Sequence, residues 1–292
     1  MVFWLNQSDE DFEARFQEFL SLKREVSVDV DAAVAEIIDD VRACKHAAVA
    51  EYTARFDRLD VSETARFSVA EIDAAAASVG AEDRAALELA IARVQSFHER
   101  QRPADEAYTD DVGVELGWRW TSVSAAGIYV PGGQAAYPSS VYMNAIPAKV
   151  AGVPRIAMCV PTPNGAVNKL VLTAAFLCGV TEIYRIGGAQ AVAALAYGTE
   201  DIAPVDKIVG PGNAFVAAAK RRVFGQVGID MIAGPSEILV VADKDNDPAW
   251  IAADLLSQAE HDADAQSILV TDDAPFAQAV ADAVESQLKT LP

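Results

Sequence analysis

From residue 125 onward, short runs rich in apolar and β-branched residues alternate with runs that have helical apolar spacing. Strands and helices that alternate in this way form parallel βαβ units, in which helices cover both faces of the sheet. The sequence therefore predicts an α/β fold with Rossmann-like parallel sheets. The strand-like runs are 125–133, 155–161, 182–188, 207–213, 229–243 and 267–273.

The first ~110 residues favour helices. Residues 9–25 form an amphipathic run with Phe12, Phe16 and Phe19 on one face, and 28–57 and 83–103 also have helical spacing. Residues 113–123 alternate as a short hairpin or meander does. Pro-Gly turns later in the chain suggest that one α/β domain is inserted into another. The predicted parts are a helical arm (1–24), a first α/β domain (25–128 plus 236–292) and a second, Rossmann-like one (129–235).

Composition restricts the partners and the compartment. The net charge of −20 at pH 7 opposes binding to nucleic acid, because phosphates must be met by basic groups. The amino end has no basic region typical of a secretory signal, and no apolar run is long enough to span a membrane. Three cysteines without metal-type spacing are expected to be buried and reduced, as in a cytoplasmic protein.

Glycine-bearing turns follow four of the predicted strands, in "YVPGG", "RIGGAQ", "IVGPGN" and "IAGPSE". Ligands of open α/β sheets bind at the carboxyl ends of the strands, where glycine allows the backbone to approach closely. Glycines also end strands in many α/β proteins without any ligand. Four such turns at one edge favour a ligand cleft, and none matches GxGxxG or a P-loop.

Neutral polar side chains stand at these turns: Tyr129, Gln190, Asn213 and Ser236. They suit amide, ribose or hydroxyl groups of a ligand. Helix capping is the alternative role for Asn213 and Ser236, and a place in the core is the alternative for Tyr129.

Gln258 and His261 lie three residues apart on a predicted helix, so they share one face. A surface histidine at a helix carboxyl end is one interpretation of His261, because the helix dipole stabilises a cation there. The other interpretation is a metal site, for which two ligands are too few.

Long stretches of the sequence, 127–153, 185–199 and 205–262, together resemble histidinol dehydrogenases, as do "LKRE" and "FHERQRP" nearer the amino end. Enzymes of that family are zinc-dependent homodimers. They oxidise L-histidinol through L-histidinal to L-histidine with NAD⁺, in the last step of histidine biosynthesis.

The resemblance implies roles for the residues singled out above. Tyr129, Gln190 and Asn213 would contact NAD. Ser236 would contact the substrate, and Gln258 and His261 would bind both zinc and substrate. The zinc would hold the imidazole and amine of histidinol and so orient the alcohol carbon towards the nicotinamide.

The family's catalytic Glu-His pair and two further metal ligands would all fall after Pro292. We therefore expect no catalytic residue in this chain, no turnover by the chain alone, and a homodimer only for the full-length protein. Two alternatives remain open: a related NAD- and zinc-dependent dehydrogenase of another alcohol, such as a sulfonated one, and a non-catalytic binding or assembly module. Dehydrogenase assays that compare histidinol with sulfonated diols would distinguish the first alternative from a histidinol dehydrogenase. A tight, stoichiometric zinc site would argue against the second.

Overall fold

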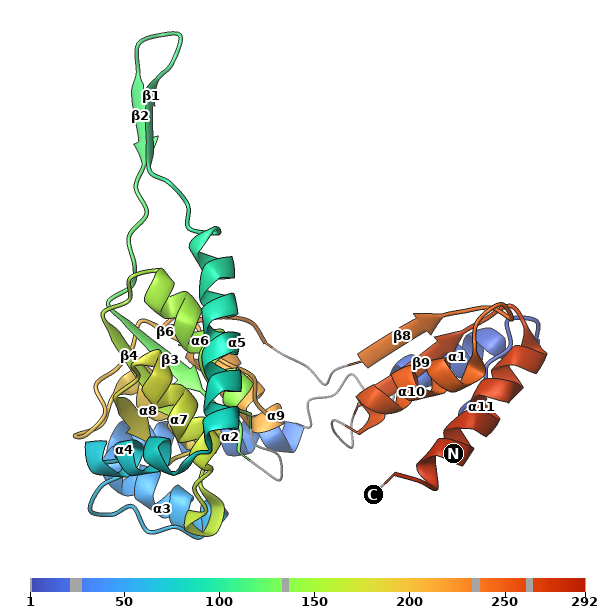
Figure 1. The fold of residues 1–292 in the computed structure, drawn as a ribbon, viewed down its shortest axis with the longest axis horizontal. Helices are drawn as coiled ribbons and strands as arrows, with labels where there is room; N and C mark the ends of the chain where they lie inside the picture. Colours follow the sequence, from blue (N-terminus) through green and yellow to red (C-terminus); the bar gives the residue numbers. More distant parts are fainter. Residues whose placement is uncertain (1, 22–27, 133–136, 233–236, 261–264, 292) are drawn as a thin grey trace. The chain divides into compact units, whose positions relative to one another are not determined.

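The computed structural model describes residues 2–21, 28–132, 137–232, 237–260 and 265–291. Its contacts group the chain into two compact units, which are described separately below (Figure 1). The larger unit is Val26–Ala233, and the smaller one joins Met1–Glu25 to Gly234–Pro292.

The larger unit is built on a sheet of five parallel strands in the order β5-β4-β3-β6-β7. The central strand pairs on both sides, and Gly127 lies opposite Ala157 in one neighbour and Ile208 in the other. The predicted α/β class with parallel strands is confirmed. The strands are β3 (Ala125–Tyr129), β4 (Arg155–Cys159), β5 (Glu182–Tyr184), β6 (Lys207–Val209) and β7 (Gly228–Ile229).

Strand residues alternate between two buried faces of this sheet. Ile128 and Met158 belong to one hydrophobic cluster, whereas Tyr129 and Cys159 belong to the other. Successive side chains of a strand point to opposite faces, so both faces must be covered by helices.

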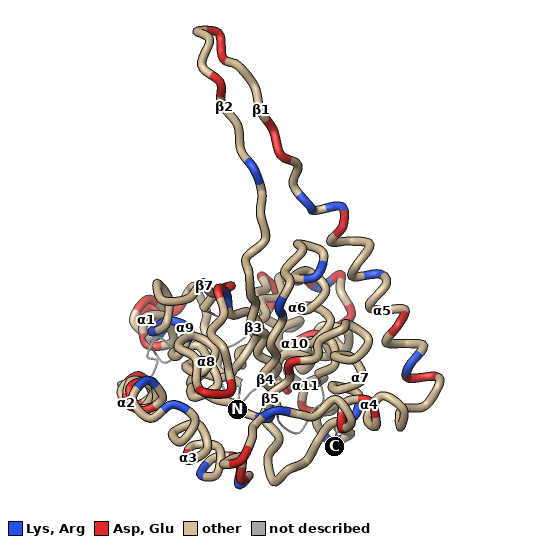
Figure 2. The backbone as a smooth tube through the Cα atoms, turned by 90° about the vertical axis from the view of Figure 1, so that its left-hand side faces the viewer, with Lys and Arg blue, Asp and Glu red and all other residues tan. Residues whose placement is uncertain are grey.

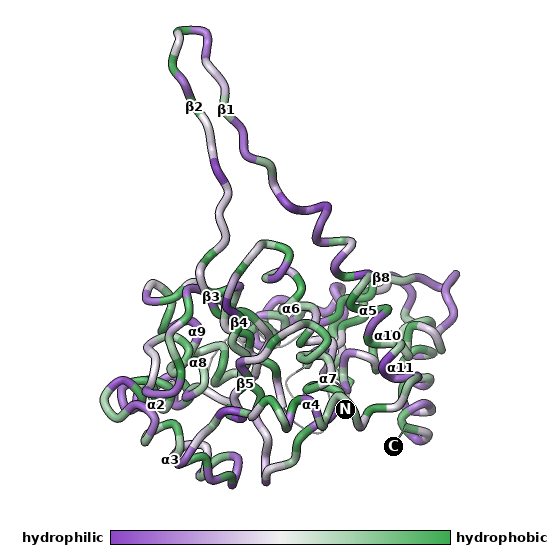
Figure 3. Tube along the Cα trace, turned by 60° about the vertical axis from the view of Figure 1, so that its left-hand side comes forward, coloured by the Kyte–Doolittle hydropathy of each residue, from purple (hydrophilic) through white to green (hydrophobic). Residues whose placement is uncertain are grey.

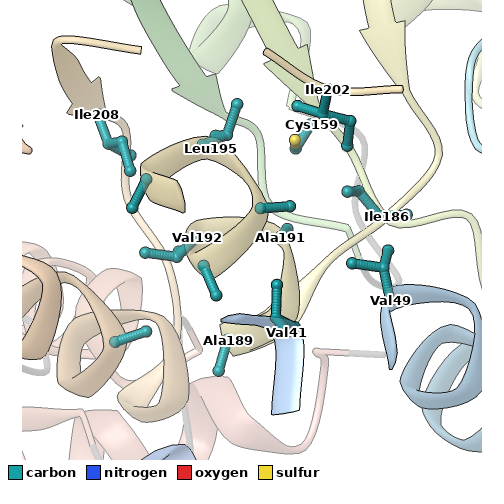
Figure 4. Close-up of a cluster of buried hydrophobic side chains, with 14 of the residues drawn as sticks. Val41, Val49, Cys159, Ile186, Ala189, Ala191, Val192, Leu195, Ile202 and Ile208 are labelled. Carbon is teal, nitrogen blue, oxygen red and sulfur yellow. The ribbon is translucent and has the colours of Figure 1, made fainter. Parts of the chain in front are cut away.

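The first face is covered mainly by α8, which contributes eight buried residues and is rich in alanine. Its Leu195 lies over Gly127, where a Cβ would be only 3.0 Å from the Leu195 Cδ1. Figure 4 shows α8 side chains between Val41 and Val49 on one side and Cys159, Ile202 and Ile208 on the other. The helices of this layer are α2 (Val28–Cys44), α3 (His46–Asp57), α8 (Gly188–Tyr197) and α9 (Ala214–Val223).

The second face is covered by α4 (Val69–Ser78), α5 (Ala81–Glu99), α6 (Pro138–Val150) and α7 (Lys169–Cys178), with the short 3-10 helix η1 (Pro163–Gly165) before α7. Helix α4 is absent from the elements predicted above. Its start nevertheless has a sequence signal, because Ser68 and Glu71 form a capping box in which each side chain accepts from the other residue's N–H.

A hairpin of β1 (Glu106–Thr109) and β2 (Glu115–Trp118) projects from this unit (Figure 1). The predicted hairpin covered β2 but not its partner β1. Both strands are exposed, and one face carries Tyr108, Leu116 and Trp118. Figure 2 shows acidic residues along the hairpin, and Figure 3 shows hydrophobic residues between them.

The smaller unit contains a parallel pair of strands that is packed on two helices. Ile251, Ala252, Phe276 and Val280 form its buried core. The predicted face of aromatic residues on α1 is visible in the stacking of Phe12 on Phe16, at 5.7 Å between ring centroids. Its elements are α1 (Phe12–Ser21), β8 (Glu237–Val241), α10 (Pro248–Ala259), β9 (Gln266–Val270) and α11 (Ala274–Leu288).

Some expectations differ from the structure. The run 229–243 is divided, because β7 joins the five-stranded sheet and β8 belongs to the smaller unit. The contacts group 26–128 with that sheet, whereas 25–128 was predicted to belong with 236–292; the domain division of the full-length protein stays a prediction. Cys159 and Cys178 are buried as expected, but Cys44 is exposed at the end of α2. None of the described helices is long and apolar enough to cross a membrane.

The packing of α8 on the sheet gives a stability prediction. Leu195→Ala should lower the free energy of unfolding by about 2–5 kcal/mol, because it removes a fully buried side chain and leaves a cavity. Leu89→Ala makes the same chemical change at a side chain that is 61% exposed on α5, and should cost less than about 0.5 kcal/mol. Urea unfolding followed by circular dichroism measures both, and equal losses would contradict this packing.

Candidate functional site

The turns after β3, β4 and β5 meet around one proline at the carboxyl edge of the five-stranded sheet. A Cβ on Gly132 would lie 2.5 Å from Pro161 Cγ, and a Cβ on Gly187 would lie 2.5 Å from Pro161 Cβ. Any larger residue at either glycine would force these turns apart. The predicted glycine turns after β3, β5 and β6 all follow strands of this parallel sheet and so lie at the same edge. Most of the fourth predicted turn, "IAGPSE", lies outside the described residues.

A pocket of about 390 Å³ opens at this edge. It is lined by the turns after β3 and β4, by Phe67 and Tyr137, and by the first residues of α7. Thr162 lies in its wall and is 3% exposed, and its Oγ1 has no hydrogen-bond partner in the described part of the chain. A buried hydroxyl without a partner costs free energy unless a ligand or water satisfies it.

Tyr129, at the end of β3, is buried, and its hydroxyl oxygen accepts a hydrogen bond of 3.0 Å from the N–H of Gly188. Its alternative role as a core aromatic is therefore realised, while its hydroxyl holds the first residue of α8. Burial raises the pKa of Tyr129 to about 12. The phenol keeps its proton at neutral pH and is not a general base there.

Gln190 lies in the first turn of α8 and is 1% exposed. Its Oε1 is buried and finds no hydrogen-bond partner among the described residues. Gly188, at φ +62°, lies directly beside it, since a Cβ there would be 2.7 Å from this oxygen. The structure thus brings Tyr129 and Gln190 together at Gly188.

Asn213 is the N-cap residue of α9, and its side-chain oxygen accepts from the N–H of Val216 at 3.2 Å. Its alternative role as a helix cap is therefore realised too. The turn that precedes Asn213 packs closely against the end of β3, because a Cβ on Gly210 would collide with the carbonyl oxygen of Tyr129. Asn213 is exposed at the same sheet edge as Tyr129 and Gln190.

An ion pair between a buried lysine and a partly exposed aspartate lies behind this turn and has no motif in the sequence. Lys220 on α9 is 3% exposed and pairs with Asp230, which follows β7. Burial acts to raise the pKa of Asp230, but the hydrogen bonds from Lys220, Gly210 and Met231 outweigh it and hold the pKa below its usual value. The one sequence signal is the position of Lys220 between Val216 and Val223, on the apolar face of α9.

The predicted metal and substrate residues belong to the smaller unit. Gln258 lies in the last turn of α10, and its Nε2 is buried and has no partner within the described ranges. His261 and Ser236 lie outside the described residues. In the part of the chain that is described, no three His, Cys, Asp or Glu side chains gather into a metal-binding group.

Among the described residues, Tyr129, Gln190 and Thr162 place a phenol, an amide and a hydroxyl at the edge of the larger sheet, all neutral. The partly buried carboxyl of Asp57 acts electrostatically on Tyr129, and burial raises the pKa of Asp57. Burial also raises the pKa of Cys159, which leaves this thiol protonated and unreactive. Neutral hydrogen-bonding groups beside glycine turns and helix starts suit a polar organic ligand with anionic groups.

Comparison with known proteins identifies the family. The family model for histidinol dehydrogenase matches residues 21–292. The histidinol dehydrogenases of Ruegeria pomeroyi and Mesorhizobium japonicum are 68% and 64% identical to this chain, which spans 67% and 68% of their lengths.

A solved structure agrees with this match. The crystal structure of histidinol dehydrogenase from Elizabethkingia anophelis superposes with a TM-score of 0.86 at 38% identity, over 99% of this chain and 66% of that one. This chain thus spans about two-thirds of the length of its relatives. It belongs to the histidinol dehydrogenase family.

Proposed function

We propose that this chain forms the NAD-binding part, and a portion of the zinc and substrate site, of a cytoplasmic homodimeric enzyme that oxidises L-histidinol to L-histidine. The name of its relatives supports the substrate. One observation carries the cofactor: the buried Gln190 oxygen has no partner among the described residues, at an edge where three glycine turns meet.

The residues at this edge fit NAD. Gln190 Oε1 and Thr162 Oγ1 are buried polar atoms that a ligand would satisfy. Asn213 and the start of α9 add donors that suit a pyrophosphate. When bound, NAD⁺ accepts a hydride from the substrate, and the protein supplies position and exclusion of water.

The zinc assignment depends on Gln258 and His261. The Nε2 of Gln258 is buried and has no partner in the described chain, so no described hydrogen bond from this atom fixes the amide. Zinc usually takes four ligands in proteins, so these two residues form only part of a site. Ser236, which belongs to the same unit of the chain, would contact the substrate.

Oxidation of an alcohol also needs a base to take the hydroxyl proton. Tyr129 remains a neutral phenol and does not serve as this base at neutral pH. Because Gln258 and His261 form only part of a zinc site, we expect the chain alone to bind cofactor without turnover.

The cofactor site is tested with an isosteric substitution. Gln190→Leu should weaken NAD⁺ binding by roughly tenfold, the loss expected for one or two hydrogen bonds. It should leave the free energy of unfolding within about 1 kcal/mol, because the oxygen it removes has no partner in the described structure. Calorimetric titration gives the affinity and urea unfolding gives the stability.

Gln95→Leu is the matched control, because Gln95 lies on the exposed surface of α5 and bonds to Glu99. It should change neither quantity. Equal NAD⁺ affinity of wild type and Gln190→Leu would remove Gln190 from the cofactor site. If wild type itself does not bind NAD⁺, the proposed function fails.

The reaction is tested by joining this chain to the remaining carboxyl-terminal third of the Ruegeria pomeroyi enzyme. The chimera should form NADH from L-histidinol, and a chelator should abolish the absorbance increase at 340 nm. The chain alone should form none under the same conditions. Turnover by the chain alone would contradict the incomplete zinc site proposed above, and turnover of a sulfonated diol in preference to histidinol would reassign the substrate.

A further inference from the structure

A closed ring of hydrogen bonds surrounds Gly210 in the turn between β6 and α9. The N–H of Gly210 donates to Asp230 Oδ2 at 2.8 Å, and its carbonyl oxygen accepts from Lys220 Nζ at 2.7 Å. Lys220 and Asp230 then bond to each other and close the ring. Both polar groups of one glycine are thus held by two oppositely charged side chains.

The glycine held in this way has an unusual conformation. Its φ of +119° lies in the region that residues with a Cβ rarely adopt, and a Cβ there would collide with the Tyr129 carbonyl. Glycine is also the most flexible residue, so this conformation needs external contacts to persist. The ring supplies them, and it thereby fixes the direction in which the chain leaves β6.

The ring also contacts two neighbouring segments, the start of α9 and the chain after β7. Asn213 follows Gly210 by three residues and begins α9, the helix that carries Lys220. On the other side, Asp230 Oδ1 accepts from the N–H of Met231 at 2.7 Å, and Met231 lies two residues before the larger unit ends at Ala233. One ion pair therefore anchors both the turn with Asn213 and Met231, near the end of this unit.

Stability alone gives little reason for a lysine at this position. Lys220 is 3% exposed on a helix whose neighbouring buried residues are apolar. Taking an ammonium out of water costs several kcal/mol, and a well-packed apolar side chain at this position would avoid that cost. An apolar side chain would not supply the directed hydrogen bond to the Gly210 carbonyl or the contact with Asp230.

We propose that Lys220 and Asp230 are positioning residues for the cofactor, which hold the Gly210 turn so that Asn213 and the start of α9 meet the bound dinucleotide. This inference rests on the proposed function. Neither side chain needs to touch the cofactor, since both act through the backbone of Gly210.

The test compares two ion pairs at opposite ends of the same sheet. Arg155 and Glu182 begin β4 and β5, and their hydrogen bonds of 2.6 and 2.9 Å lie at the amino edge, away from the glycine turns. Lys220→Met and Arg155→Met each remove the cation of one pair. Calorimetric titration with NAD⁺ should be done well below the melting temperature of every variant.

Lys220→Met should raise the NAD⁺ dissociation constant by roughly tenfold or more, whereas Arg155→Met should lower the melting temperature without changing that constant. Asp230→Asn keeps an oxygen for the Gly210 N–H and removes the charge, so it should give a smaller rise. If Lys220→Met does not fold, Asp230→Asn decides the question.

The proposal is overturned if the folded Lys220 and Asp230 variants bind NAD⁺ as wild type does, or if Arg155→Met weakens binding to the same extent. Both results presuppose that wild type binds NAD⁺. A wild-type chain that shows no NAD⁺ binding would instead overturn the proposed function, so the two failures are distinguishable.

Discussion

The larger unit depends on the close approach of α8 to the central strand β3. A parallel sheet has to be covered on both faces, and Gly127 leaves the space that Leu195 and Val205 occupy, each 3.0 Å from where a Cβ would be. The many alanines of α8 allow α2 and α3 to pack on its other side (Figure 4). The first turn of α8 then lies at the carboxyl edge of the sheet, where Gly188 meets the Tyr129 hydroxyl.

The same packing holds two unpaired polar atoms at this edge. Other buried groups of the unit are paired, as in the contact of Thr173 with the Lys169 carbonyl, although Thr53 Oγ1 and Arg185 Nε also have no partner in the described chain. At the edge, Gln190 and Thr162 are held by packed helices and turns in positions where the described chain gives their oxygens no partner. Unsatisfied atoms at a glycine-lined edge support our proposal that a dinucleotide binds there.

Local patterns in the sequence were sufficient for most strands, most helices and the glycine turns at the carboxyl edge of the sheet. The βα alternation and the glycine turns predicted the positions of Tyr129, Gln190 and Asn213, because these features depend on nearby residues. The capping box at Ser68 is equally local, yet the alanine-rich run after it gives only a weak periodic signal. Strand β1 is short and fully exposed, so burial imposed no pattern on it.

Contacts between distant segments could not be predicted from such patterns. Lys220 and Asp230 meet because β7 lies beside β6, and no local rule predicts that a lysine on an apolar helix face will find a carboxylate there. Likewise, the packing of 26–128 against the five-stranded sheet is set by tertiary contacts, and the division of 229–243 follows from where two sheets begin and end.

The claim that the carboxyl edge of the five-stranded sheet is the dinucleotide site is tested most directly by amide hydrogen exchange with and without NAD⁺. We predict slower exchange in peptides that cover 129–132, 185–190 and 210–214, and unchanged exchange at the amino edge around Arg155 and Glu182. Protection confined to the amino edge or to the smaller unit, or no protection at any NAD⁺ concentration, would contradict this account.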